Sequence, residues 1–153
     1  MTLITGATRR AFLATAGGGL TALVVAPSSV LADTKMVADE IAKLYGGKSI
    51  KEGRIKLDLP SIAENGLVVP LSFEVESPMT EADYVKTVHF FAEGNPNPQV
   101  ASFTFTPFAP KAAASIRIRL AKTQNIVAIA EMSNGDVYKA TKEVKVTIGG
   151  CGG

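Results

Sequence analysis

The only cysteine of this 153-residue chain, Cys151, is the third residue from the C-terminus. A single cysteine cannot form a disulfide within its own chain, and the usual zinc site needs further Cys or His ligands. A thiolate is a good sulfur nucleophile, and an ordinary cysteine, with a pKa of about 8.5, is a few per cent thiolate at neutral pH. We therefore expect this thiol to react with another molecule.

Residues 149–153 form a short glycine segment around the cysteine. The four glycines are Gly149, Gly150, Gly152 and Gly153. Residues without side chains give a thin, mobile backbone, and three extended residues place Cys151 about 10 Å beyond Ile148. We interpret the segment as a carrier arm that presents the thiol to other proteins. The alternative is an incidental terminal cysteine that forms an interchain disulfide, because chain ends are often frayed.

The first 32 residues are typical of a twin-arginine export signal. Arg9 and Arg10 precede an Ala-Phe-Leu sequence and an apolar stretch, in the order that such signals require. The stretch is too short and too rich in glycine to span a membrane. We expect cleavage after Ala32, a mature chain that begins at Asp33, and a periplasmic location.

The mature chain is expected to be electrically neutral. Without Arg9 and Arg10, the 16 Lys and Arg residues fall to 14, which equals the 14 Asp and Glu residues. No run of basic residues remains to attract nucleic acid or an anionic membrane surface. The length suits one domain with an ordinary hydrophobic core.

The elements that must position the thiol are predicted from periodicity. Residues 34–45 have near-helical spacing and are followed by a Gly-Gly stop; the apolar positions are Met36, Val37, Ile41 and Leu44. Alternating or short apolar runs then predict seven strands at 54–59, 67–76, 84–93, 100–106, 115–120, 125–132 and 137–148. Asn65-Gly66 and Asn134-Gly135 are read as turns, the second as the strongest hairpin signal. The prediction for residues 33–148 is an immunoglobulin-like antiparallel β-sandwich with a short N-terminal helix and a flexible C-terminal glycine arm.

An independent thiol enzyme is a further alternative. It would need the single histidine, His89, beside Cys151, whereas the strand pattern favours a packed or surface histidine. Glu74 and Glu76 alternate with apolar residues and are interpreted as one solvated strand face, not an acid/base pair.

Two further groups of residues have more than one interpretation. Arg117 and Arg119 share one strand face, where they are either solvated or a site for an acidic partner or anion. Three phenylalanines are interpreted as core or partner-interface residues; these are Phe103, Phe105 and Phe108.

Three segments carry a resemblance to a known family. They are SPMTEADYV at 77–85, RLAKTQN at 119–125 and VKVTIGGCGG at 144–153. Together with the export signal and the predicted sandwich, they resemble SoxY, the sulfur-binding Y subunit of the periplasmic Sox carrier. The resemblance covers essentially the whole chain, and every position of the family's terminal Gly-Gly-Cys-Gly-Gly motif is present.

The resemblance implies a sulfur carrier protein of thiosulfate or reduced-sulfur oxidation, not an enzyme. Cys151 would hold the intermediates covalently as thiosulfonate or persulfide-type groups, and the four glycines would form its swinging arm. No cofactor or metal would be bound. The implied partners are a SoxZ-like subunit in a heterodimer, a c-type cytochrome that conjugates thiosulfate, a dimanganese hydrolase that releases sulfate, and a sulfane dehydrogenase. An exposed thiol also suggests a disulfide-linked dimer of heterodimers.

Overall fold

The computed structural model describes residues 29–150. The export-signal residues Arg9 and Arg10 lie outside this range, as do Cys151 and the last two glycines. The export signal and the position of the thiol therefore remain predictions from the sequence.

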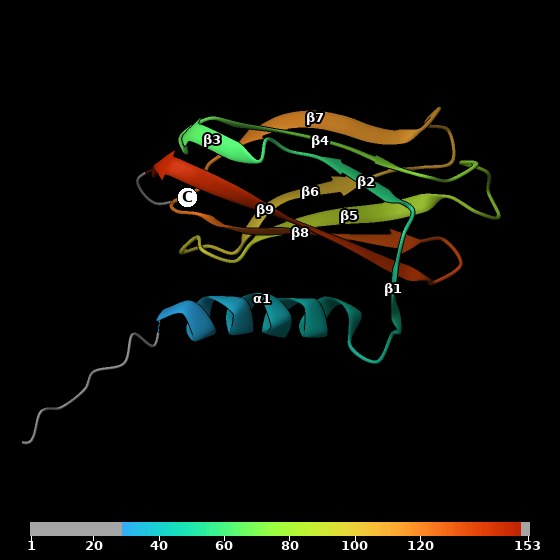
Figure 1. The fold of residues 1–153 in the computed structure, drawn as a ribbon. Helices are drawn as coiled ribbons and strands as arrows, with labels where there is room; N and C mark the ends of the chain where they lie inside the picture. Colours follow the sequence, from blue (N-terminus) through green and yellow to red (C-terminus); the bar gives the residue numbers. More distant parts are fainter. Residues whose placement is uncertain (1–28, 151–153) are drawn as a thin grey trace, which may run out of the picture.

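The described residues form one helix and nine strands (Figure 1). They are α1 (Ser29–Tyr45), β1 (Ile50–Glu52), β2 (Ile55–Asp58), β3 (Ile62–Asn65), β4 (Val69–Val75), β5 (Val85–Ala92), β6 (Gln99–Thr104), β7 (Ala112–Ile118), β8 (Gln124–Met132) and β9 (Val137–Ile148). The larger sheet has the order β1-β9-β8-β5-β6, with β3 also beside β9, and the smaller sheet has the order β2-β4-β7. The β-sandwich predicted from the sequence is confirmed.

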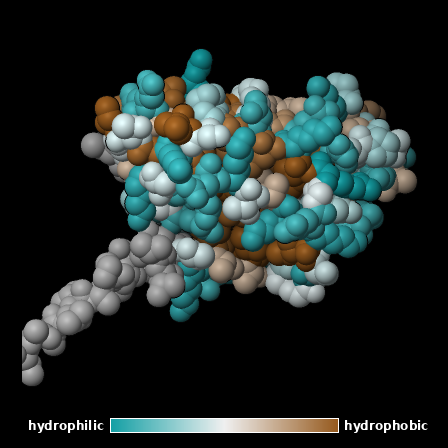
Figure 2. All heavy atoms as spheres, viewed as in Figure 1, coloured by the Kyte–Doolittle hydropathy of each residue, from teal (hydrophilic) through white to brown (hydrophobic). Residues whose placement is uncertain are grey.

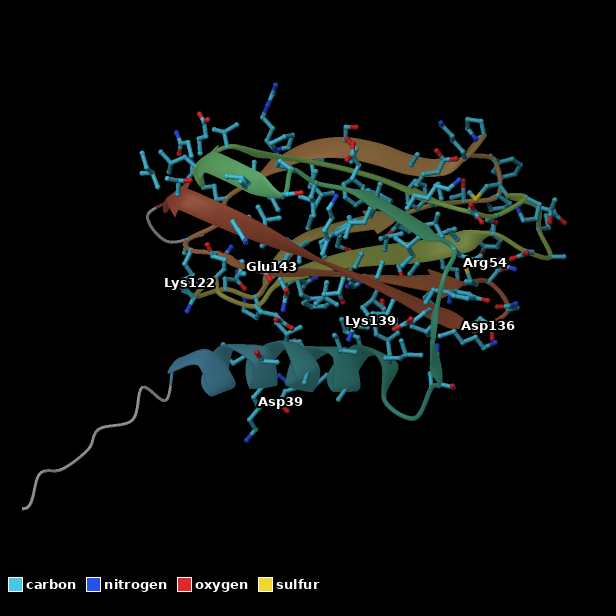
Figure 3. All side chains as sticks on the ribbon, in the orientation of Figure 1. Asp39, Arg54, Lys122, Asp136, Lys139 and Glu143 are labelled. Carbon is cyan, nitrogen blue, oxygen red and sulfur yellow. The ribbon has the colours of Figure 1, made fainter. Side chains whose placement is uncertain are left out.

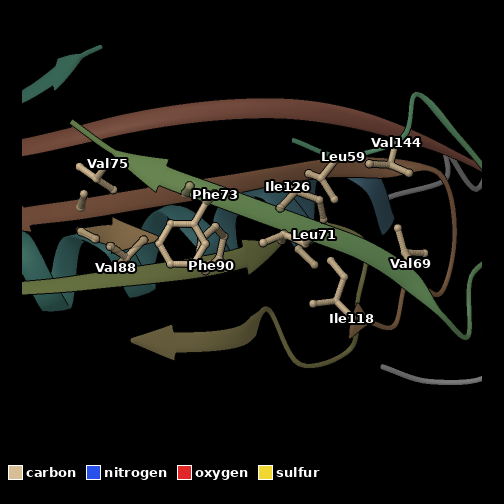
Figure 4. Close-up of a cluster of buried hydrophobic side chains, with 14 of the residues drawn as sticks. Leu59, Val69, Leu71, Phe73, Val75, Val88, Phe90, Ile118, Ile126 and Val144 are labelled. Carbon is tan, nitrogen blue, oxygen red and sulfur yellow. The ribbon is translucent and has the colours of Figure 1, made fainter. Parts of the chain in front are cut away.

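The main core lies between the two sheets (Figure 4). Leu71 and Phe73 project into it from β4, and Val88 and Phe90 meet them from β5. The rings of Phe73 and Phe90 lie 4.9 Å apart between centroids, in a tilted arrangement. Alternate residues of each strand point inward because a pleated strand has a side-chain period of two.

Helix α1 covers the outer face of the larger sheet (Figure 1). Val37, Ile41 and Tyr45 follow each other at intervals of four and pack against that face, as expected for one stripe of an α-helix. Met36 and Leu44, which the sequence placed in the same apolar set, are exposed instead. Each lies one residue before a contact residue, Val37 or Tyr45, and therefore points to the side of the contact stripe. The buried face of the helix is thus narrower than predicted.

Strand β8 is buried on both of its faces because helix and small sheet cover it from opposite sides. Val127 and Ile129 contact the helix layer, whereas Ile126, Ala128 and Ala130 belong to the main core. This double burial explains the nearly continuous apolar run in its sequence.

Two short strands, β1 and β3, were not predicted from the sequence. Both pair parallel with β9, β1 near its start and β3 near its end. All three residues of β1 are exposed, and β3 has one buried residue among four, so neither shows the alternation that identifies a strand. Strand β9 is consequently paired along both edges, with β1 and β3 on one edge and the antiparallel strand β8 on the other.

The end of the sandwich near the start of β9 is closed by ion pairs (Figure 3). We call this group the charged end, and its members are Lys48–Glu131 at 2.8 Å, Lys51–Asp136 at 2.9 Å and Arg54–Asp83 at 3.3 Å. Figure 3 shows Arg54 and Asp136 together at this end, whereas Lys122 and Glu143 lie near the other.

Candidate functional site

The chain leaves the sandwich through a small set of backbone hydrogen bonds at the end of β9. The Gly66 amide donates to the Ile148 carbonyl at 2.8 Å, and the Leu120 amide donates to the Gly66 carbonyl at 2.7 Å. The Gly150 amide donates to the Leu120 carbonyl at 3.0 Å. These four residues, which we call the arm root, join three separate segments of the chain. Gly150 is buried there, although the sequence alone placed it in a mobile arm.

The glycines in and next to the arm root have no space for a side chain. A methyl group on Gly66 would overlap the carbonyl oxygen of Leu120 and lie 2.7 Å from the amide nitrogen of Gly150. One on Gly149 would overlap the carbonyl oxygen of Ala121. One on Gly150 would lie 2.9 Å from the Gly66 carbonyl oxygen. Close approach of backbones, as well as flexibility, is therefore a reason for glycine at these positions.

Two buried polar side chains hold the loop that receives the arm. The Asn95 amide group donates to the Arg119 carbonyl at 2.9 Å, and its oxygen accepts from the Ala121 amide at 3.0 Å and from Gln124 at 2.9 Å. The Gln124 oxygen in turn accepts from the Gly94 amide at 2.7 Å. Buried polar groups with satisfied hydrogen bonds fix a single backbone geometry. Asn95 and Gln124 therefore fix the carbonyls of Leu120 and Ala121 that face the arm.

Sequence reasoning missed this support. The predicted turn at Asn65-Gly66 is present, with the Leu67 amide donating to the Asn65 side chain at 2.9 Å. The Gly66 amide and carbonyl in addition bond to two other segments, which the turn signal did not indicate. The available signal was the pair of segments at 119–125 and 144–153, which both carried the family resemblance. The described part of the second segment, 144–150, lies beside the first.

Several exposed apolar residues belong to the segments that meet at the arm root, and Figure 2 shows hydrophobic atoms among hydrophilic ones on the surface of the sandwich. Ile148 is 67% exposed and Ile62, on the neighbouring strand β3, is 61% exposed. Leu67 and Val68, which follow Gly66, are also exposed. An exposed apolar group next to a functional segment is typical of a contact surface for other proteins.

His89 is far from the arm and packed as expected. It faces Tyr45 and Phe91 at 6.0 and 6.4 Å between ring centroids, and burial lowers its pKa. His89 pairs with Ile129 of β8, and Ile129 pairs with Lys139 of β9. Lys139 lies nine residues before Ile148, which is a distance of about 30 Å along the strand. The roughly 10 Å between Ile148 and Cys151 is too short to bring the thiol to this ring.

The other candidate residues fit their structural interpretations. Glu74 and Glu76 pair with Lys111 and Lys56 on the surface of the small sheet. Arg117 and Arg119 are exposed and line one shallow hollow.

The three phenylalanines separate into two groups. Phe103 and Phe105 pack against the core, whereas Phe108 is 90% exposed. Phe108 therefore remains a candidate partner contact.

Residues 29–150 also bear on metal binding and membrane spanning. In this part of the chain, no three His, Cys, Asp or Glu side chains gather as a metal site would require. The helix described here lacks the length and apolar character needed to cross a membrane.

The fold and site define a small β-sandwich that presents its C-terminal segment from one rim. A family model described as sulfur oxidation protein SoxY matches residues 41–151. The chain belongs to this family.

Solved structures agree with this assignment. The sulfur carrier protein SoxY from Chlorobium limicola f thiosulfatophilum is 36% identical, with a TM-score of 0.63 over 75% of this chain and 99% of that one. A superoxide reductase (neelaredoxin) from Ignicoccus hospitalis is 22% identical, with a TM-score of 0.54 over 69% of this chain and 85% of that one. The second likeness concerns the fold alone. Comparison with curated proteins gave no match.

The family resemblance inferred from the three sequence segments is therefore confirmed. The protein is a sulfur carrier of sulfur oxidation.

Proposed function

We propose that Cys151 carries the sulfur intermediates covalently and that partner enzymes act on them there. In the first step the thiol and thiosulfate form a new sulfur–sulfur bond, giving Cys–S–S–SO₃⁻, one proton and two electrons. A c-type cytochrome accepts the electrons. Hydrolysis by a dimanganese enzyme then releases sulfate and a proton and leaves a persulfide on Cys151. A sulfane dehydrogenase then oxidises the outer sulfur of the persulfide to a sulfonate, with oxygen atoms from water and with six electrons passed to a c-type cytochrome acceptor. A further hydrolysis releases this sulfonate as sulfate and frees the thiol.

The observation that carries the proposal is the arm root. Gly150 lies at the rim of the sandwich and is bonded to Leu120, and the only cysteine of the chain is the next residue. A thiol one residue beyond the rim of the domain is within reach of other proteins. That arrangement suits a group handed to several partners in turn.

We further propose that the carrier works in the periplasm as a heterodimer with a SoxZ-like subunit. The twin-arginine pattern at Arg9 and Arg10 supports export. The partner enzymes would supply the base that activates the thiol, because the described residue best suited to that role, His89, lies about 30 Å away along the sheet.

A structural sandwich with an interchain disulfide is the competing function. It predicts a stable disulfide dimer and no sulfur adduct, whereas the carrier forms such a dimer only as an oxidised side product.

Intact-protein mass spectrometry distinguishes these functions. The purified chain is incubated with thiosulfate and the oxidised cytochrome partner, with and without reductant, beside a Cys151→Ser variant. The carrier function predicts a reductant-sensitive, thiosulfate-sized adduct on the native chain and none on the variant. Unmodified chain and disulfide dimer alone would contradict it, and an adduct that survives in Cys151→Ser would contradict the assignment of the site.

A further inference from the structure

The arm root changes how far the thiol can move. If the chain were free from Ile148 onward, Cys151 could range about 10 Å from the end of β9. The bond between the Gly150 amide and the Leu120 carbonyl instead fixes the chain two residues later. Only one Cα–Cα step, about 3.8 Å, then separates Cys151 from a fixed residue. The root therefore shortens the free chain that leads to the cysteine from three Cα–Cα steps to one.

Gly66 is the residue that makes this fixation possible. Its amide and carbonyl provide two of the three bonds of the root, to Ile148 and Leu120. A side chain at this position would meet backbone atoms of Leu120 and Gly150, which cannot turn away as a flexible side chain can. Any larger residue must therefore push these segments apart.

We propose that Gly66 is a positioning residue for the carrier thiol. This inference rests on the proposed function of Cys151. By letting Gly150 dock, Gly66 orders Gly149 and Gly150 before any partner arrives. A partner's active site then does not have to order these residues itself, and such preorganisation strengthens binding without adding a contact. Gly66 acts through the arm and does not touch the transferred sulfur.

The substitution Gly66→Ala tests the docking directly. Loss of the Gly150 hydrogen bond should speed exchange of the Gly150 amide proton about tenfold, as measured by NMR on the purified chain. A nitroxide on Cys151, the only cysteine, should move faster in the same variant. Unchanged amide exchange and unchanged label motion would overturn the proposal.

Gly46→Ala is the matched control. A methyl group on Gly46 would lie 2.5 Å from the Ala42 carbonyl oxygen, so it also forces backbone atoms apart. It does so after α1, beside the opposite end of β9. The control should leave exchange at Gly150 unchanged, and equal effects of the two variants would also overturn the proposal.

Kinetics with the cytochrome partner separate positioning from a merely structural role. Gly66→Ala should raise the KM for the carrier about tenfold, because the partner must now order two more residues, whereas kcat should stay near the native value. A KM equal to that of Gly46→Ala would contradict positioning.

The native chain provides a test that needs no variant to fold. Its Gly150 amide should be protected from exchange, whereas an unprotected amide would refute the docking. The adduct measurement on Cys151 is independent of this result. Protection without any adduct would contradict the proposed function alone, and adduct formation without protection would contradict the positioning role alone.

Discussion

The two ends of the sandwich are closed by different kinds of contact. At the charged end, side chains form ion pairs such as Arg54–Asp83 and Lys51–Asp136. At the arm root, backbone amides and carbonyls bond directly across glycines. The backbone bonds depend on the space between segments of the chain, whereas the ion pairs depend on the charge of side chains and weaken with salt. A substitution at the arm root therefore acts by separating backbone segments, and one at the charged end acts by removing a charge.

Glycine also serves different purposes at the two ends. Gly135, near the charged end, has a φ of 89°, a backbone conformation that favours glycine in the turn between β8 and β9. Gly66 and Gly149 are glycines because neighbouring backbone carbonyls leave no space for a Cβ atom. A substitution at the first site strains the turn, and one at the second separates segments of the chain.

The largest effect is expected from removing the support of the arm root. Asn95→Ala deletes three hydrogen bonds and leaves the Arg119 carbonyl and Ala121 amide without these partners. Buried groups without partners are costly, so the free energy of unfolding should fall by about 3 kcal/mol, measured by urea denaturation. Asn97→Ala, an exposed asparagine of the same loop, should change it by less than about 0.5 kcal/mol. Equal losses of unfolding free energy in the two variants would contradict the role of the Asn95 hydrogen bonds in holding this loop.

A smaller effect is expected at the charged end. Arg54→Ala removes a partly exposed ion pair with Asp83, and such pairs contribute less than about 1 kcal/mol. The loss should shrink further at high salt, because ions screen the pair. Denaturation at two salt concentrations measures this, with Arg119→Ala as the matched exposed arginine. A loss that is large and independent of salt would show that Arg54 acts through packing.

The smallest effect is expected from pH. The hydrogen bond from Lys48, with further help from Lys86, holds the pKa of Glu131 below its ordinary value of 4.5. A carboxyl with a depressed pKa stabilises the fold above its ordinary pKa, and this contribution is lost as the pH falls through the lowered value. Stability should therefore decline below about pH 4.5, and less steeply in Glu131→Gln than in Glu143→Gln. Equal slopes in a pH series of urea titrations would contradict this assignment.

Much of the fold follows from local sequence patterns. The seven predicted strands correspond to β2 and β4–β9 because their apolar residues alternate or run continuously. Strands β1 and β3 carry no such pattern, since both are short and mostly exposed. They form strands only because they pair with β9, and the local sequence contains no pattern that predicts this pairing.

The candidate site could be predicted only in part. Cys151 and its glycines were evident from residue type, and the family was evident from three segments. The docking of Gly150 was not, because it depends on Gly66 and Leu120, which lie 84 and 30 residues earlier in the chain. The sequence shows that glycine is present, but flexibility and close packing require the same residue.

The position of β9 has a consequence for the folding of the chain. This strand is the last of the described elements in chain order, yet it pairs with β8, β1 and β3 and so completes the larger sheet. Contacts between such distant segments form slowly, because loops must close before the contacts stabilise the structure. The sandwich therefore reaches its final form only after β9 has been synthesised. The arm root includes the end of β9 and therefore forms only when this strand pairs. A chain that has not finished folding lacks the ordered rim that precedes the cysteine.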